Sequence, residues 1–233
     1  MKTISGMLLA IVLLVPSFCF AQGGGGGGPI VAQERGLKDT LILASENAIK
    51  KLGVVNGFFG NDKVKIPLPP ALQKVEKVIR ALGMKKDADE LVETMNHAAE
   101  QAVPEAKTLL NQAIQKMSVQ DAKGIITGGD NAATAYFRKA TEAELTAKFL
   151  PIVTKATEKV GLAQKYNKIA KSGSKLGLVD KQDAKVEDYV TRKALDGLFY
   201  MMAEEEKNIR KNPMQAGSTW IRRIFGGIRP DRI

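Results

Sequence analysis

The sequence predicts an all-α protein, a compact bundle of several helices, some of them short. Apolar residues recur at spacings of three and four along most of the chain, which is the period of a helix with one buried face. No stretch alternates apolar and polar residues for long enough to predict a confident strand. With 44% hydrophobic and 26% charged residues, the chain has the composition of a globular domain.

The N-terminus has the pattern of a secretory signal peptide. Lys2 precedes an apolar run over 7–15 that is too short to span a bilayer, which takes about 20 apolar residues. Ala21 and Cys19 supply the small side chains that signal peptidase accepts, so we expect cleavage near Ala21 and a periplasmic or secreted protein without cysteine. We do not expect lipid anchoring at Cys19, because Phe18 stands where a lipoprotein site has a small residue.

The composition along the chain predicts a simple organisation. Six consecutive glycines follow the cleavage site, and such a run has no side chains to bury and a freely moving backbone. We therefore expect a signal peptide over 1–21, a Gly-rich flexible leader over 22–34, a single all-helical domain over 35–226 and a basic tail over 227–233.

The first half of the domain contains clear helix boundaries. An apolar stripe predicts a helix from Leu37 to Leu52, followed by a turn and a proline-rich extended segment. Pro70 is expected in the first turn of the next helix, because proline suits that position. A long helix beginning near Asp87 should kink or restart at Pro104.

The second half contains several candidate helix caps. Ser118 with Asp121 predicts the start of a short helix. Asp130 is the expected N-cap of the next helix, and the capping-box spacing of Thr141 and Glu144 predicts a further start. The remaining expectations are a bend at Pro151, a cap at Thr191 for the last long helix, and a short helix opening at Ser218.

Several of these stretches, in this order, resemble one bacterial family. They are Lys65-Ile66-Pro67-Leu68-Pro69, Lys74-Val75-Glu76-Lys77, Met95-Asn96-His97-Ala98-Ala99-Glu100, Gly128-Gly129-Asp130-Asn131-Ala132-Ala133-Thr134, Tyr136-Phe137-Arg138, Lys193-Ala194-Leu195-Asp196-Gly197-Leu198-Phe199 and Ala203-Glu204-Glu205-Glu206-Lys207. From about Gly36 to about Gly226 the chain is similar to the domain of unknown function 4197 family. The resemblance implies an exported helical protein and carries over no catalytic residue, ligand or cofactor.

The charge balance favours acidic partners. Lys and Arg number 35 against 25 for Asp and Glu. An excess of this size suits an anionic membrane surface, an envelope polymer or a protein partner, although solubility alone also explains it. We expect no nucleic acid partner, because the protein is exported and aromatic residues make up only 6% of the chain. The oligomeric state is left open.

Three residues are a candidate metal site. Glu93, His97 and Glu100 are spaced by four and three, so they share one helix face. One imidazole and two carboxylates suit Zn²⁺ or Fe²⁺. The alternative is a solvated flank position, because His97 lies off the apolar stripe, and we expect no cofactor in the protein.

Two further stretches are candidate binding sites. Gly128, Gly129 and Asp130 precede a helix start, where free backbone N–H groups can hold an anion, or they are simply a helix stop and a cap. A stretch near the C-terminus can seat at an anionic membrane or on a partner, or else dock into the core; it contains Trp220, Arg222, Arg223 and Phe225. The three glutamates at 204–206 are interpreted as a solvated helix face.

The sequence therefore favours a binding or interaction module without enzymatic activity. Its expected partner is an acidic or amphiphilic envelope component, or a protein. The alternative is a metal-dependent or carboxylate-based hydrolase on a helical bundle. The chain has no nucleophile elbow and no His-Glu-x-x-His motif, but pairs of carboxylates can assemble from distant parts of a sequence.

Overall fold

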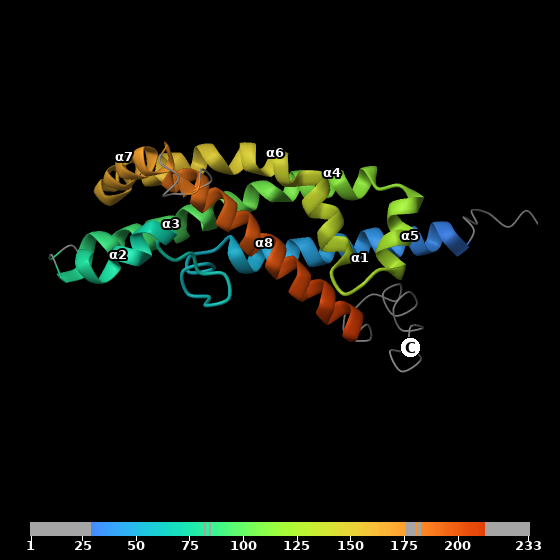
Figure 1. The fold of residues 1–233 in the computed structure, drawn as a ribbon. Helices are drawn as coiled ribbons and strands as arrows, with labels where there is room; N and C mark the ends of the chain where they lie inside the picture. Colours follow the sequence, from blue (N-terminus) through green and yellow to red (C-terminus); the bar gives the residue numbers. More distant parts are fainter. Residues whose placement is uncertain (1–28, 82, 84, 176–179, 181–182, 213–233) are drawn as a thin grey trace, which may run out of the picture.

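A computed structural model describes residues 29–81, 83, 85–175, 180 and 183–212, and every regular element in them is helical. The all-α expectation is confirmed, with no strand in this part of the chain. The elements are α1 (Pro29–Leu52), α2 (Pro70–Ala81), α3 (Lys85–Ala102), the 3₁₀ turn η1 (Val103–Glu105), α4 (Ala106–Lys116), α5 (Val119–Thr127), α6 (Ala132–Thr157), α7 (Gly161–Lys175) and α8 (Val186–Lys211). Figure 1 shows α2 and α7 at one end of the bundle and α5 at the other. None of the described helices is both long and apolar enough to cross a lipid bilayer.

The first helix begins earlier than the sequence indicated. The Gly-rich leader was expected to extend over 22–34, but α1 starts at Pro29. The physical reason is that proline suits the first helical turn and that no helix breaker follows it directly. The predicted buried stripe is confirmed, since Leu37, Leu41 and Leu52 are all buried.

Side chains of other helices hold the irregular segment between α1 and α2. The buried amide of Asn96 on α3 accepts a hydrogen bond from Ile66 N at 2.8 Å and donates one to Ile66 O at 2.9 Å. The hydroxyl of Tyr189 on α8 donates to Pro67 O at 3.2 Å. The prolines impose an extended conformation, and backbone groups of this segment find hydrogen-bond partners in side chains rather than in a neighbouring strand. As predicted, Pro70 opens the next helix.

Proline divides one predicted long helix but not another. At Pro104 the chain leaves α3, makes the 3₁₀ turn η1 and restarts as α4, which confirms the predicted restart. Pro151, in contrast, lies inside the continuous helix α6. The expected start at Thr141 is wrong, because Thr141 lies in the middle of α6 and its hydroxyl donates to Phe137 O at 2.8 Å. That bond to the preceding turn satisfies the hydroxyl inside a helix.

The start of α5 is fixed by a cap within its own first turn, whereas the start of α8 is fixed by a side chain of α7. Ser118 and Asp121 form the predicted start of α5 as a complete capping box. The last helix begins at Val186, not at Thr191 as expected, because Asn167 on α7 accepts the hydrogen bond of Val186 N at 2.9 Å. Thr191 is instead buried within α8.

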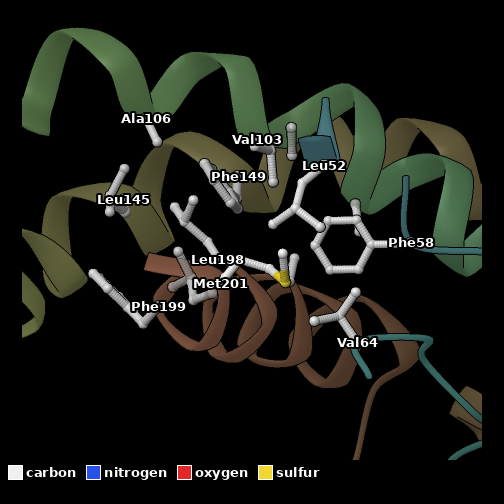
Figure 2. Close-up of a cluster of buried hydrophobic side chains, with 14 of the residues drawn as sticks. Leu52, Phe58, Val64, Val103, Ala106, Leu145, Phe149, Leu198, Phe199 and Met201 are labelled. Atoms are coloured by element: carbon white, nitrogen blue, oxygen red, sulfur yellow. The ribbon is translucent and has the colours of Figure 1, made fainter. Parts of the chain in front are cut away.

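Helices α6 and α8 form the centre of the core. Figure 1 shows α8 running diagonally across the bundle, where it contacts α6, α1 and α3. Figure 2 shows side chains of these helices meeting in one apolar cluster with the loop residues Phe58 and Val64. The labelled members of the cluster on helices are Leu52, Val103, Ala106, Leu145, Phe149, Leu198, Phe199 and Met201.

Gly197 on α8 makes room for the ring of Phe58. A Cβ at Gly197 would lie 2.5 Å from Cε1 of Phe58, whose side chain is fully buried. We therefore predict that Gly197→Ala lowers the free energy of unfolding by about 1–3 kcal/mol, measured by denaturant titration. Gly124 on α5 is the matched control, because nothing lies within 4 Å of its added Cβ. Gly124→Ala should raise the stability by about 1 kcal/mol, since alanine is the better helix former; equal effects at the two sites would contradict the packing account.

Two buried tyrosines make the fold sensitive to high pH. Burial raises the pKa of Tyr166 to about 12, and Asp183 adds to this; burial likewise raises the pKa of Tyr189 to about 12. Above pH 10 the unfolded chain loses these protons while the folded chain keeps them, so the stability present below pH 10 falls as the pH rises towards 12. We expect the denaturation midpoint to fall across this window, and the fall to be smaller in Tyr166→Phe. A midpoint that does not change with pH would contradict the assignment.

Candidate functional site

The predicted metal residues lie together on α3, beside the loop that follows α1. The Nδ1–H of His97 donates to Oε2 of Glu100 at 2.6 Å, and Nε2 of His97 lies 3.6 Å from Oε1 of Glu93. Glu100 is buried, whereas 59% of the Glu93 side chain is exposed. The ring of His97 also packs 5.8 Å from that of Phe59.

The carboxylate of Glu100 holds the loop. Its Oε1 accepts hydrogen bonds from Phe58 N at 2.9 Å and from Phe59 N at 3.0 Å. With His97 on Oε2, both oxygens are engaged by donors, which is how a buried carboxylate is stabilised. Across the described residues, no group of three or more His, Cys, Asp or Glu side chains is arranged to hold a metal ion. The geometry thus gives Glu100 a structural part in positioning the loop.

The predicted anion site lies before α6, and a carboxylate of the chain itself fills that helix start. Glu206 on α8 accepts hydrogen bonds from Ala133 N and Thr134 N, each at 2.9 Å, and from the Thr134 hydroxyl. Free N–H groups at a helix start favour a negative charge, and here the charge comes from a residue 72 positions further along the chain.

Asp130 does not cap α6 as the sequence indicated. It is exposed, and the N-cap is Asn131, which makes no side-chain capping bond. The physical reason is that Glu206 already takes the donors that a cap would satisfy. Gly128 allows the close approach of the chain here, since an added Cβ would lie 2.6 Å from that of Ala132, while nothing lies within 4 Å of one at Gly129.

Arg210 completes this contact. Its Nε and Nη2 donate to Oε1 of Glu206 at 3.0 and 2.8 Å, and Nη2 also donates to Ile125 O at the end of α5. Glu206 is buried, so the interpretation of residues 204–206 as a solvated face is wrong for this residue. Glu205 is also buried and pairs with Lys51 of α1, which sequence spacing within one helix could not indicate.

The C-terminal candidate surface lies outside the described residues. It comprises Trp220, Arg222, Arg223 and Phe225.

A cluster of unpaired lysines lies where α6 meets α7. We name this cluster the lysine corner; its members are Lys155, Lys159, Lys165, Lys168 and Lys171. All five are exposed, and none forms an ion pair with another described residue. The only carboxylate between Lys155 and Lys171 is Glu158.

The amphipathic pattern of α7 sets the direction of these lysines. Leu162, Tyr166 and Ala170 are buried at spacings of four, while Lys165, Lys168 and Lys171 follow the opposite side at spacings of three. The Tyr166 hydroxyl donates to the backbone carbonyl of Asp183 at 2.5 Å, which fixes α7 to the segment before α8.

Some cations elsewhere in the described chain form ion pairs. Lys63 pairs with Glu204 at 3.1 Å, and this pairing raises the pKa of Lys63. Arg138 and Arg192 both contact Asp196. Other exposed lysines, such as Lys116, Lys123 and Lys139, also form no ion pair with a described residue. The lysine corner differs from them in density, because residues 155–171 contain five lysines and a single carboxylate. A surface rich in charges of one sign favours a negatively charged ligand.

Over the residues that the structure describes, the chain is an all-helical protein with buried carboxylate contacts and a row of exposed lysines on α6 and α7. Residues 31–226 match the model of the family described as Protein of unknown function (DUF4197), and the chain belongs to this family. No curated protein and no solved structure matches the chain.

The Glu100 contact gives a direct mutational prediction. Glu100→Ala leaves one buried and one partly buried backbone N–H group without an acceptor, each worth about 1–3 kcal/mol, so we expect a loss of about 2–4 kcal/mol of stability. Hydrogen exchange should accelerate at the amides of Phe58 and Phe59. Glu93→Ala is the control on the same helix and should change stability by less than about 0.5 kcal/mol, since Glu93 is exposed. Unchanged exchange at the two amides in Glu100→Ala would show that the carboxylate does not hold the loop.

Proposed function

We propose that this protein is exported and acts as a binding module, without enzymatic activity, for an acidic or amphiphilic component of the cell envelope or an acidic protein partner. The observation that supports this most directly is the lysine corner, with five exposed lysines that no described carboxylate neutralises. Unpaired charges of one sign repel each other, and an anionic ligand relieves that repulsion. The signal-peptide pattern before Ala21 supports an extracytoplasmic partner.

The contacts of two buried glutamates, Glu100 and Glu206, favour binding over hydrolysis. A general base needs an oxygen or nitrogen free to take a proton from a bound substrate. Both oxygens of Glu100 and of Glu206 accept hydrogen bonds from within the chain. The described geometry therefore assigns these carboxylates to the fold.

The experiment begins with the chain expressed from its first residue in a bacterial host. We expect the protein in the extracytoplasmic fraction with a mass corresponding to residues 22–233, and intact protein that keeps Met1 in the cytoplasm would contradict export. The purified protein is then tested for binding to phosphatidylglycerol vesicles and to polyphosphate at low and high salt. Substitution of Lys165, Lys168 and Lys171 by Gln should weaken binding to the anionic probes on the order of 100-fold at low salt, at about 1 kcal/mol per lysine.

A matched triple variant tests whether position matters beyond net charge. Lys116, Lys123 and Lys139 are exposed and lie outside the lysine corner. Their substitution by Gln removes the same charge and should weaken binding by less than about threefold, because salt screens distant charges. Equal losses in the two triple variants would refute the proposed function.

A further inference from the structure

Two grooves open beside the lysine corner, between α6, α7 and α8. The first has a volume of about 360 Å³ and lies next to Lys171; its wall includes Leu150, Asn167 and Asp188. The second has a volume of about 370 Å³ and follows α6 and α8. The grooves share Leu150 and Asp188, so a chain-like ligand can extend from one into the other. Both volumes lie within the range of about 300–1,000 Å³ that is usual for ligand pockets.

The first groove combines positive and negative charges. Lys171 and Lys185 lie on its wall, and both are exposed without an ion pair to another described residue. Glu187 and Asp188 line the α8 side of the same groove. Asn167 donates to both oxygens of Glu187, which leaves Asp188 as the carboxylate that can accept from a ligand. A ligand made only of phosphates is repelled by these carboxylates, whereas a ligand with both anionic groups and hydroxyls can place the first on the lysines and donate from the second to Asp188.

The groove walls are suited to hydroxyl groups in other respects. Thr191 and Arg192 line the second groove. Thr191 Oγ1 and Arg192 Nε are buried below its surface, and neither has a hydrogen-bond partner among the described residues. An unpaired buried polar atom costs about 1–3 kcal/mol, and a hydroxyl can both donate and accept. Leu150, shared by the two grooves, offers an apolar contact for the C–H face of a sugar ring.

Around the lysine corner, the described side chains include no strongly exposed large apolar group that could enter a bilayer. The large apolar side chains that the described residues expose most are Leu43, Val54, Val55, Val119 and Tyr200, and none of them lies on α6 or α7. Binding at a membrane interface usually combines basic residues with apolar groups that enter the lipid. A flat bilayer surface also cannot enter the two grooves.

We infer that the lysine corner and its two grooves bind an acidic glycan, a polymer of sugar or polyol units that carry carboxylate or phosphate groups. This inference rests on the proposed function and names the ligand class for the same surface. The anionic groups contact the lysines, and the hydroxyl groups enter the grooves beside Asp188. The glycan is recognised in the same way whether it is free or attached to a lipid.

The test compares four probes on the full mature chain: oligogalacturonate, a neutral glucan oligomer of similar length, polyphosphate and phosphatidylglycerol vesicles. We expect oligogalacturonate to bind about tenfold more tightly than polyphosphate of equal charge, and the neutral glucan to bind negligibly. Asp188→Ala should weaken oligogalacturonate binding about tenfold, the loss of a charged hydrogen bond. The same substitution should leave polyphosphate binding unchanged or strengthen it, because it removes a negative charge.

Controls separate this inference from the proposed function. Asp39 is exposed on α1, so Asp39→Ala removes an equal charge away from the grooves and should leave both affinities within about twofold. Asp188→Asn, which keeps an acceptor oxygen, should lose less oligogalacturonate binding than Asp188→Ala, and circular dichroism verifies folding of each variant. If Asp188→Ala strengthens binding to every anionic probe, or if vesicles bind and oligogalacturonate does not, the acidic glycan is refuted while the proposed function stands. If no anionic probe binds, both are refuted.

Discussion

The carboxylate of Glu206 is the contact on which the arrangement of the bundle depends. It lies on α8 and accepts the hydrogen bonds of the first turn of α6, while Arg210 connects it to the end of α5. Apolar packing alone tolerates small shifts of one helix along another, whereas a buried charge tolerates very little loss of its donors. The crossing of α6 and α8, on which the core is built, is therefore fixed in one register.

The same principle orders the segment between α1 and α2, which has no regular structure of its own. Glu100 accepts hydrogen bonds from the amides of Phe58 and Phe59. The side-chain amide of Asn96 accepts from the N–H of Ile66 and donates to its carbonyl. These bonds place the ring of Phe58 against Gly197, so the segment between α1 and α2 contacts α3 and α8. At the other end of the bundle, Asn167 accepts a hydrogen bond from the first residue of α8, as Glu206 accepts hydrogen bonds from the first turn of α6. Side chains from other helices thus cap α6 and α8, and Asn167 also lies on the wall of the first groove.

Sequence periodicity was sufficient for the helices and insufficient for the contacts between them. The stripe of Leu37 and Leu41, the box of Ser118 and the restart at Pro104 are local signals, and the structure confirms each of them. Asp130, Thr141 and Thr191 are cap-forming residue types that do not cap, because tertiary contacts or the preceding helical turn satisfy the groups concerned. Glu206 could not be recognised as a cap, since its partners lie more than 70 residues away. Among the candidate sites, the spacing correctly placed Glu93, His97 and Glu100 together. It could not show that the amides of the loop after α1 already donate hydrogen bonds to Glu100.

His97 is the only histidine of the chain, and it sits directly on the Glu100 contact. A proton spectrum of the protein therefore contains one set of imidazole resonances, and their chemical shifts depend on the carboxylate and on the adjacent ring of Phe59. The molecule thus carries its own spectroscopic reporter at the place where the irregular segment meets α3. Any ligand or partner that moves this segment becomes visible without labelling.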